Sequence, residues 1–207
     1  SKTASCIGDG ISRVFLWDGG SVYRTDWQGR QLLYTTARTN LCLRSQEFDN
    51  AAWLKNTSGT GTVPVVTANA GAAPDGTTTA DRIQANRGAG TTTGDYSIAA
   101  QTDNTTSGQP YTVSVWLRSN TGADQTVLVY CNGMSGSTNQ TVVTVTPNWQ
   151  RFTFTGNAST TFIQIQIGAR GAATTQSVDV LAWGAQLEAG SSATSYIPTT
   201  TAAVTVT

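Results

Sequence analysis

Four stretches of the chain alternate apolar and polar side chains with a period of two residues, the pattern of a β-strand with one buried face. They read YTVSVWLRS, NWQRFTFTG, TFIQIQIGA and VDVLAW. The side chains on their apolar faces are Tyr111, Val113, Val115, Leu117, Phe152, Phe154, Ile163, Ile165, Ile167, Val178, Val180 and Ala182. We predict that these faces meet in one hydrophobic core.

The first part of the chain has short apolar-rich stretches separated by turn sequences. Two apolar-rich stretches, ISRVFLW and SVYRTDW, are separated by the turn sequence DGG at residues 18–20, and a second turn sequence, QGR, follows at residues 28–30. Such spacing is typical of β-hairpins. We therefore predict a short β arm or meander over residues 1–36.

From residue 37 onward, short strand-like segments are separated by loops rich in Gly, Asn, Thr and Ser, among them NTSGTGT, NAGAAPDGTTT and NRGAGTTTGD. Short strands at regular spacing indicate an antiparallel β-sandwich. We predict an all-β sandwich over residues 37–198 and an extended tail over residues 199–207. No helix of three turns is expected, and residues 46–53 are predicted to form at most one short turn.

The charge of the chain limits its partners. Charged residues make up 12% of the sequence, and the 12 basic and 12 acidic side chains give a formal net charge of zero. A nucleic-acid-binding surface needs a basic patch, so we expect neither nucleic acid nor a membrane as partner. No apolar run is long enough for a membrane span, and the opening Ser1, Lys2 and Thr3 begin no signal-peptide core. We expect a soluble chain.

The sequence offers few residues for catalysis. Cys6, Cys42 and Cys131 are an odd number without CxxC spacing, and we predict isolated reduced thiols rather than a disulfide or zinc site. Histidine is absent, which excludes catalytic schemes with a histidine base. Glycoside hydrolysis needs two carboxyl groups about 5 to 10 Å apart, and nothing in the sequence pairs them. We predict that the chain is not an enzyme.

Two pairs of acidic residues are weak candidates for a structural calcium ion, because carboxylate oxygens suit this cation. The candidate ligands are Glu47 with Asp49 and Asp179 with Glu188. The alternative is that all four are ordinary solvated carboxylates. No other cofactor is expected.

Five segments follow one another in the order RTNLCLRSQEFDNAAW, APDGTTTADRI, YTVSVWLRS, NWQRFTFTG and VDVLAWGAQLEAGSSATSYIPT. Over residues 37–203 this order resembles a β-jelly-roll domain of tailed-bacteriophage virion proteins, itself similar to carbohydrate-binding modules with a galactose-binding-like fold. The closing GAQLEAG and SYIPT elements are the most specific part. The resemblance implies a non-catalytic tail fibre, tailspike or capsid-decoration component, located in the virion and assembled in the host bacterial cytoplasm.

Residues on the polar faces of the strands could bind sugars, because an aromatic ring covers the apolar face of a pyranose while Arg and Gln form hydrogen bonds with its hydroxyls. The candidates are Trp116, Arg118, Gln164, Gln166 and Trp183. We expect the strands at residues 111–118, 162–168 and 178–187 to share one sheet, which would unite the candidates on one face. In the alternative, a purely structural capsid or tail component, this face is an interface.

Lysine occurs only at positions 2 and 55, although exposed sheet edges are commonly protected by lysine. We therefore expect other copies of the chain to cover these edges, together with other virion proteins. The resemblance favours a homotrimer, with the arm and the TTTAAVTVT run of residues 199–207 in the subunit contacts. The alternative for this run is a terminus lying on its own domain. A host-surface glycan is the further partner expected if the exposed face binds sugars.

Overall fold

The structure is a computed structural model, and it describes residues 4–6, 13–17, 22–25, 31–34, 37–138 and 140–207. Its regular elements in these ranges are all β-strands. The chain forms two compact units, one comprising Ser1–Arg38 with Thr205–Thr207 and the other Thr39–Val204. Among the described residues, no helix has the length and apolar character required to span a bilayer.

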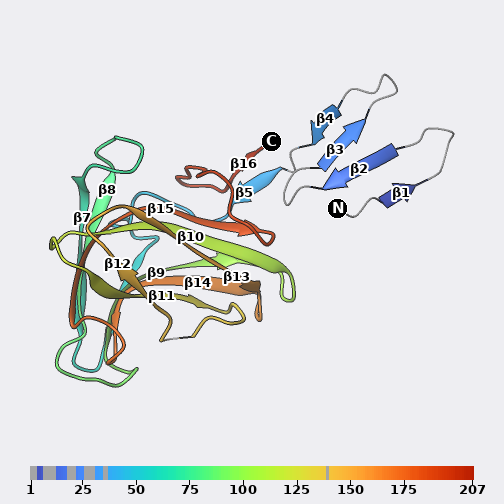
Figure 1. Cartoon of the computed structure of the whole chain (residues 1–207). Coiled ribbons are helices and arrows are strands. Elements are labelled where there is room, and N and C mark those ends of the chain that lie inside the picture. Colours follow the sequence, from blue (N-terminus) through green and yellow to red (C-terminus); the bar gives the residue numbers. More distant parts are fainter. Residues whose placement is uncertain (1–3, 7–12, 18–21, 26–30, 35–36, 139) are drawn as a thin grey trace. The chain divides into compact units, whose positions relative to one another are not determined.

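The first unit contains a four-stranded antiparallel sheet (Figure 1). Its strands, in spatial order, are β1 (Ala4–Cys6), β2 (Arg13–Trp17), β3 (Val22–Thr25) and β4 (Gln31–Tyr34). The predicted turns at residues 18–20 and 28–30 lie outside the described residues. Further along the chain, β5 (Arg38–Asn40) pairs with β16 (Val204–Val206).

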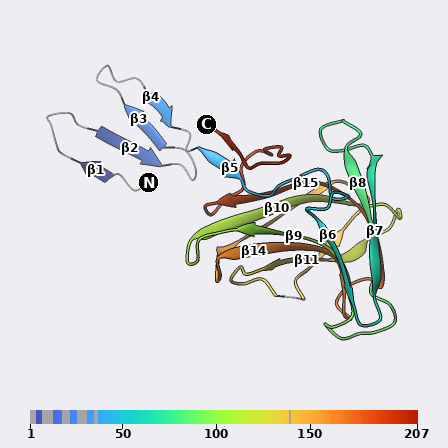
Figure 2. The ribbon, with the colours of Figure 1, turned by 180° about the vertical axis from the view of Figure 1, so that it is seen from behind.

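The second unit is a sandwich of two five-stranded antiparallel sheets (Figures 1 and 2). Sheet I has the order β13 (Gln150–Asn157), β10 (Pro110–Ser119), β15 (Ser177–Ala189), β8 (Ala80–Asn86) and β7 (Thr62–Gly71). Sheet II has the order β12 (Val142–Val145), β11 (Gln125–Asn132), β14 (Phe162–Arg170), β9 (Tyr96–Asn104) and β6 (Leu54–Ser58). The chain crosses repeatedly between the sheets, as in a jelly roll. The predicted all-β jelly-roll sandwich is confirmed.

The core lies between the two sheets and consists of the predicted apolar faces. Val115 of sheet I and Ile165 of sheet II are fully buried there, and the predicted Phe152 and Phe154 pack half-buried against the same cluster. Residues 43–53 form turns and bends rather than a helix, and they add Phe48 and Trp53 to the core. Period-two alternation therefore identified the buried face of each of these strands.

The expectation that residues 111–118, 162–168 and 178–187 share one sheet is wrong. β10 and β15 pair with each other in sheet I, but β14 pairs with β11 and β9 in sheet II. The physical reason is that alternation fixes which face of a strand is buried and leaves its pairing partner open. β14 presents its isoleucines to the core from the side opposite β10.

The two described cysteines agree with the prediction of isolated thiols. Cys42 and Cys131 are fully buried and free, whereas Cys6 lies in a strand whose side chains are outside the description. Burial raises the pKa of the Cys131 thiol to about 12. Both thiols are therefore protonated and pack as small apolar groups.

Candidate functional site

The structure divides the five predicted site residues between the two outer surfaces of the sandwich. Trp116 and Arg118 of β10 and Trp183 of β15 lie on the outer face of sheet I. Gln164 and Gln166 of β14 lie on the outer face of sheet II, because their neighbours Ile163, Ile165 and Ile167 point into the core. These residues cannot form one site.

The outer face of sheet I is not open at Trp183, which is only 4% exposed. Its ring packs against Tyr196, with 4.4 Å between the ring centroids, and its indole nitrogen donates a hydrogen bond of 3.0 Å to the Thr79 hydroxyl. Trp116 and Trp149 pack half-buried against the same small apolar cluster. These rings form a second core, so Trp183 is unavailable to a sugar.

A segment after β15, residues 190–200, covers this cluster and is called the C-terminal segment below. Asn40 donates to the carbonyl of Ile197 at 2.8 Å, and the Ser45 and Tyr196 hydroxyls are hydrogen-bonded at 2.5 Å. The Thr199 hydroxyl donates to the carbonyl of Cys42 at 2.5 Å. The specific SYIPT sequence thus holds the end of the chain on the sandwich.

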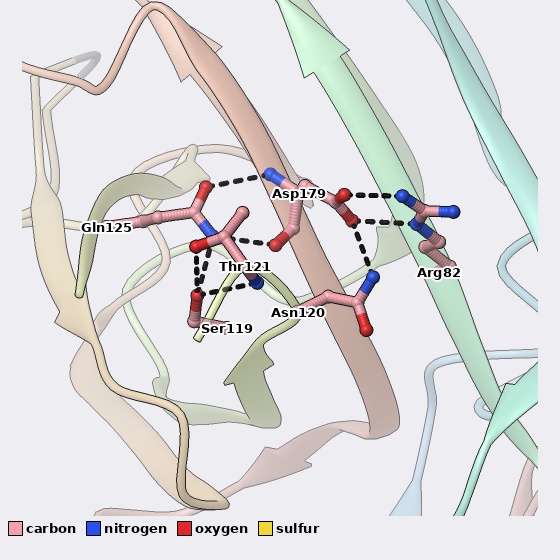
Figure 3. A network of polar contacts seen from close by, with 6 residues as sticks. All are labelled: Arg82, Ser119, Asn120, Thr121, Gln125 and Asp179. Carbon is pink, nitrogen blue, oxygen red and sulfur yellow. Dashed lines mark hydrogen bonds and ion pairs between the residues drawn. The ribbon is translucent and has the colours of Figure 1, made fainter. Parts of the chain in front are cut away.

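Asp179, a candidate calcium ligand, is neutralised within the protein (Figure 3). Arg82 donates to both of its carboxylate oxygens, at 2.8 and 2.5 Å, and Asn120 donates to one of them at 3.3 Å. The backbone of Asp179 is held on the other side by Gln125, which accepts from its N–H at 2.8 Å and donates to its carbonyl at 2.7 Å. The Arg82 contact lowers the pKa of Asp179.

The other calcium candidates are also engaged or separated. Glu188 is fully buried and lies nine residues from Asp179 along β15, which is about 30 Å in an extended strand. Glu47 forms an ion pair of 2.8 Å with Arg44, and Asp49 lines a shallow pocket with Glu47 and Asp81. No group of three or more acidic or cysteine residues in the described part of the chain is arranged to hold a metal.

The outer face of sheet II has a different character, because two tyrosines lie over its small and apolar residues. Tyr130 of β11 is opposite Gln166 in the register, and Tyr96 of β9 is opposite Arg170. Both rings pack against a cluster of Ile98, Ala100 and Leu128, which are at most 2% exposed although they face outward. The two tyrosine rings therefore help to cover this small cluster on the outer face of sheet II.

Polar side chains cross the same face as a short ladder. The side chain of Gln164 donates to the Thr102 hydroxyl at 2.9 Å, and the side chain of Gln166 donates to the Oε1 atom of Gln164 at 2.6 Å. The ladder ends at the Oε1 atom of Gln166, which is buried and accepts no hydrogen bond. In the register opposite Gln166, the Tyr130 hydroxyl donates to the side-chain Oδ1 atom of Asn132 at 2.9 Å.

Arg170 lies at the end of β14 on this face, and its guanidinium carbon is 4.5 Å from the centroid of the Tyr96 ring. The residue is 8% exposed, and its Nε atom is buried without an acceptor. Burial lowers the pKa of the guanidinium, and the phenols of Tyr96 and Tyr130 act in the opposite direction. The side chain is a desolvated cation stacked on an aromatic ring.

Tyrosine rings, amides and a guanidinium on one sheet face are suited to recognising hydroxyl-rich ligands. Sequence reasoning found Gln164 and Gln166 but missed Tyr96, Tyr130 and Arg170. Every second residue of β14 points outward, and continuing this alternation beyond Gln166 would have identified Arg170 as an outward residue. TVLVYCNG, which contains Tyr130, is apolar on both faces, so alternation gave no signal there.

Comparisons with known proteins give no family: no family model matches the sequence, and no curated protein does. Among solved structures, a family 4 carbohydrate-binding module ("CBM4 structure and function") is 22% identical over 54% of this chain and 72% of its own, with a TM-score of 0.39. The enzymatically active domain of tailspike protein 4 from bacteriophage CBA120 is 13% identical over 73% of this chain and 21% of its own, with a TM-score of 0.46. The CBM22-1 xylan-binding domain of Xyn10C from Paenibacillus barcinonensis is 14% identical over 76% of this chain and 95% of its own, with a TM-score of 0.42. None of these scores reaches 0.5, so the residues of the chain itself have to carry any functional conclusion.

Proposed function

We propose that this chain is a non-catalytic surface protein of a tailed-bacteriophage virion and that the outer face of sheet II binds a glycan of the host. The virion assignment is supported by the GAQLEAG and SYIPT elements, whose residues form the C-terminal segment and its anchors. As a virion protein it is assembled in the host bacterial cytoplasm. Its other partners are further virion proteins and other copies of itself, with a homotrimer as the proposed state.

The proposal of glycan binding rests on one observation, the buried side-chain Oε1 atom of Gln166, which accepts no hydrogen bond. A buried polar atom without a hydrogen bond costs about 1 to 3 kcal/mol, so native proteins retain few of them. This atom lies on an outer face, at the end of an amide ladder and opposite Tyr130 in the register. A sugar hydroxyl donating to Gln166 would remove the penalty.

The chemistry of the neighbouring side chains agrees with a sugar. A tyrosine ring offers apolar surface to the C–H face of a pyranose, and the amides and hydroxyls beside it are donors and acceptors for ring hydroxyls. Thr102 and Asn132 extend this polar surface on either side of Gln164, which pairs with both in the register.

A non-catalytic role agrees with the positions of the carboxylates. The glutamates Glu47 and Glu188 are engaged in an ion pair and in a buried hydrogen-bond network. The strands of sheet II contain one acidic residue, Asp103, and its side chain is buried on the inner side. No carboxylate of the described residues stands on the proposed binding face to act as acid or nucleophile.

A purely structural role is the second candidate. It is favoured by Val63 and Val65 of β7, which are 58% and 59% exposed. Neighbouring exposed valines on an edge strand are suited to contact with another protein. This surface is separate from sheet II, so a structural contact and a glycan site are compatible.

Binding to a glycan array tests the proposal. The wild-type chain should bind a subset of bacterial polysaccharides, and Gln166→Ala should reduce this binding because it removes the end of the amide ladder. Thr153→Ala is the matched control, since Thr153 is exposed on the outer face of sheet I. Absence of binding to every glycan, or equal effects of both substitutions, would leave the structural role.

A further inference from the structure

The charge of Arg170 is not balanced by any acidic group on its sheet. Among the described arginines, Arg44 and Arg82 form ion pairs, and Arg87 and Arg151 donate to backbone carbonyls. The electrostatic neighbours of Arg170 are two tyrosine phenols. No carboxylate among the described residues forms an ion pair with it.

The composition of the five strands of sheet II shows the same excess of positive charge. Their only acidic residue, Asp103, accepts a hydrogen bond from the backbone of Leu43 on the inner side and is 7% exposed. Their only lysine, Lys55, donates to the carbonyls of Asp49, Asn50 and Trp53. The outer face therefore carries one positive charge and no negative charge.

The backbone between Gln166 and Arg170 comes very close to the neighbouring strand β9. Gly168 lies between Gln166 and Arg170 on the outer face, and its φ of 153° is rarely adopted by other residues. A Cβ atom at Gly168 would lie 2.2 Å from the Ser97 carbonyl oxygen. Glycine is thus required here, and the outward side chains of Ile98 and Leu128 pack opposite it, between the unpartnered Gln166 Oε1 and the unpartnered Arg170 Nε.

We propose that the ligand of this face is an acidic glycan, and that a uronic-acid carboxylate binds the guanidinium of Arg170 while a hydroxyl of an adjacent sugar donates to Gln166. The two residues are four positions apart on β14, about 13 Å, a separation that linked sugars bridge. A planar guanidinium matches a carboxylate with two parallel hydrogen bonds. This inference rests on the proposed function and narrows its ligand.

The structure supplies two unpartnered polar atoms on side chains that are both more than nine-tenths buried, Gln166 at 5% and Arg170 at 8% exposed. A neutral glycan would satisfy Gln166 and leave the cation desolvated. A carboxylate compensates for that desolvation because it brings the opposite charge to a water-poor site. A ligand that contains a hydroxyl and a carboxylate group can satisfy both atoms and also balance the charge of Arg170.

The test uses the full chain on an array of acidic bacterial polysaccharides, each printed in its native form and after reduction of its carboxyl groups to alcohols. The native forms should bind, and carboxyl reduction should weaken binding by about 30-fold or more, the usual consequence of removing one partner of a buried charge pair. Arg170→Gln should cause a similar loss of binding. Arg170→Lys should cause a smaller loss, because lysine keeps the positive charge but lacks the planar guanidinium group. Sodium chloride should weaken binding of the native forms only.

Arg118→Gln is the matched control, because Arg118 lies over Trp149, 5.5 Å from the ring centroid, on the other sheet. It should leave binding unchanged, and thermal unfolding of all variants checks that they fold. Binding that survives both carboxyl reduction and Arg170→Gln would overturn the acidic-glycan inference and retain the proposed function. Binding of no glycan at all would overturn both.

Discussion

Thr194 donates two hydrogen bonds to the carboxylate of Glu188, one from its backbone N–H at 3.0 Å and one from its hydroxyl at 2.5 Å. The side chain of Gln186 donates to the same carboxylate at 2.6 Å. Its Oε1 atom accepts a hydrogen bond from the N–H of Ile197 at 2.7 Å. Two residues of β15 thereby fix the C-terminal segment at two points. The GAQLE residues of β15 therefore hold the SYIPT residues of the C-terminal segment in place.

Glu188→Ala should lower the free energy of unfolding by on the order of 3 kcal/mol, because the buried Gln186 amide and two half-buried donors of Thr194 lose this acceptor. Glu188→Gln, which keeps one acceptor oxygen, should cost less. Chemical denaturation monitored by tryptophan fluorescence measures both. Glu47→Ala is the control, since its ion pair with Arg44 is partly exposed and should contribute at most about 1 kcal/mol. Equal losses at both glutamates would contradict the anchoring role of Glu188.

The two faces of β14 should respond differently to truncation. Ile165→Ala should destabilise the sandwich by about 2 to 5 kcal/mol, because Ile165 is fully buried between the sheets. Gln164→Ala should cost about 1 to 2 kcal/mol, less than Ile165→Ala, because Gln164 is only half-buried but its side-chain oxygen accepts a hydrogen bond from the buried Gln166. Thermal denaturation of the two variants distinguishes them. Similar losses would mean that the outward face of β14 is also part of a core.

The sequence predicted strand faces well, because the alternation in residues 111–117 and 163–167 follows directly from burial of one side. The sequence did not predict which strands pair. For this reason Trp183 and Gln166 were wrongly expected on one surface. Trp183 has the position of a surface residue in its strand, but Tyr196 covers it from 13 residues further along the chain. Such coverage depends on tertiary contacts that no local pattern contains.

Stability should fall as the pH rises from 5 to 8. Burial raises the pKa of Asp103 to about 7 and that of Asp81 to about 6, from an ordinary value of 3.8. A raised pKa in the folded state means that protonation favours folding, so this stabilisation is complete below about pH 4 and is lost as the pH passes 6 and 7. The chain has no histidine to obscure the effect.

Asp103→Asn identifies the group responsible for most of this dependence, since the Asp103 Oδ2 atom is buried without a partner. The variant should be more stable than wild type at pH 8, by on the order of a few kcal/mol, and its stability should vary less between pH 5 and 8. Below pH 4 both proteins should lose stability, because hydrogen bonds hold the pKa of Asp95 down at about 2. Denaturant midpoints across this range provide the measurement, and a stability that rises from pH 5 to 8 would contradict the assignment.

Self-association should depend on the chain beyond Thr200. Thr199 and Thr200 bond to residues 42–45 and belong to the sandwich, so a truncation that removes them would also disturb a monomer. Removing residues 201–207 keeps these bonds and deletes β16, which pairs with β5 and whose Val204 and Val206 are 36% and 48% exposed. Exposed β-branched residues in a short strand are suited to pairing with another chain.

We expect sedimentation velocity to show a homotrimer for the full chain at micromolar concentration and a smaller species after removal of residues 201–207. Thermal stability should then become independent of protein concentration, because association stabilises a fold by mass action. Val63→Ser with Val65→Ser is the control, since these valines are more exposed but lie on β7 of the sandwich. If they, rather than residues 201–207, determine the assembly, the contacts lie on the edge of sheet I. A full-length chain that remains monomeric would contradict self-association through either surface.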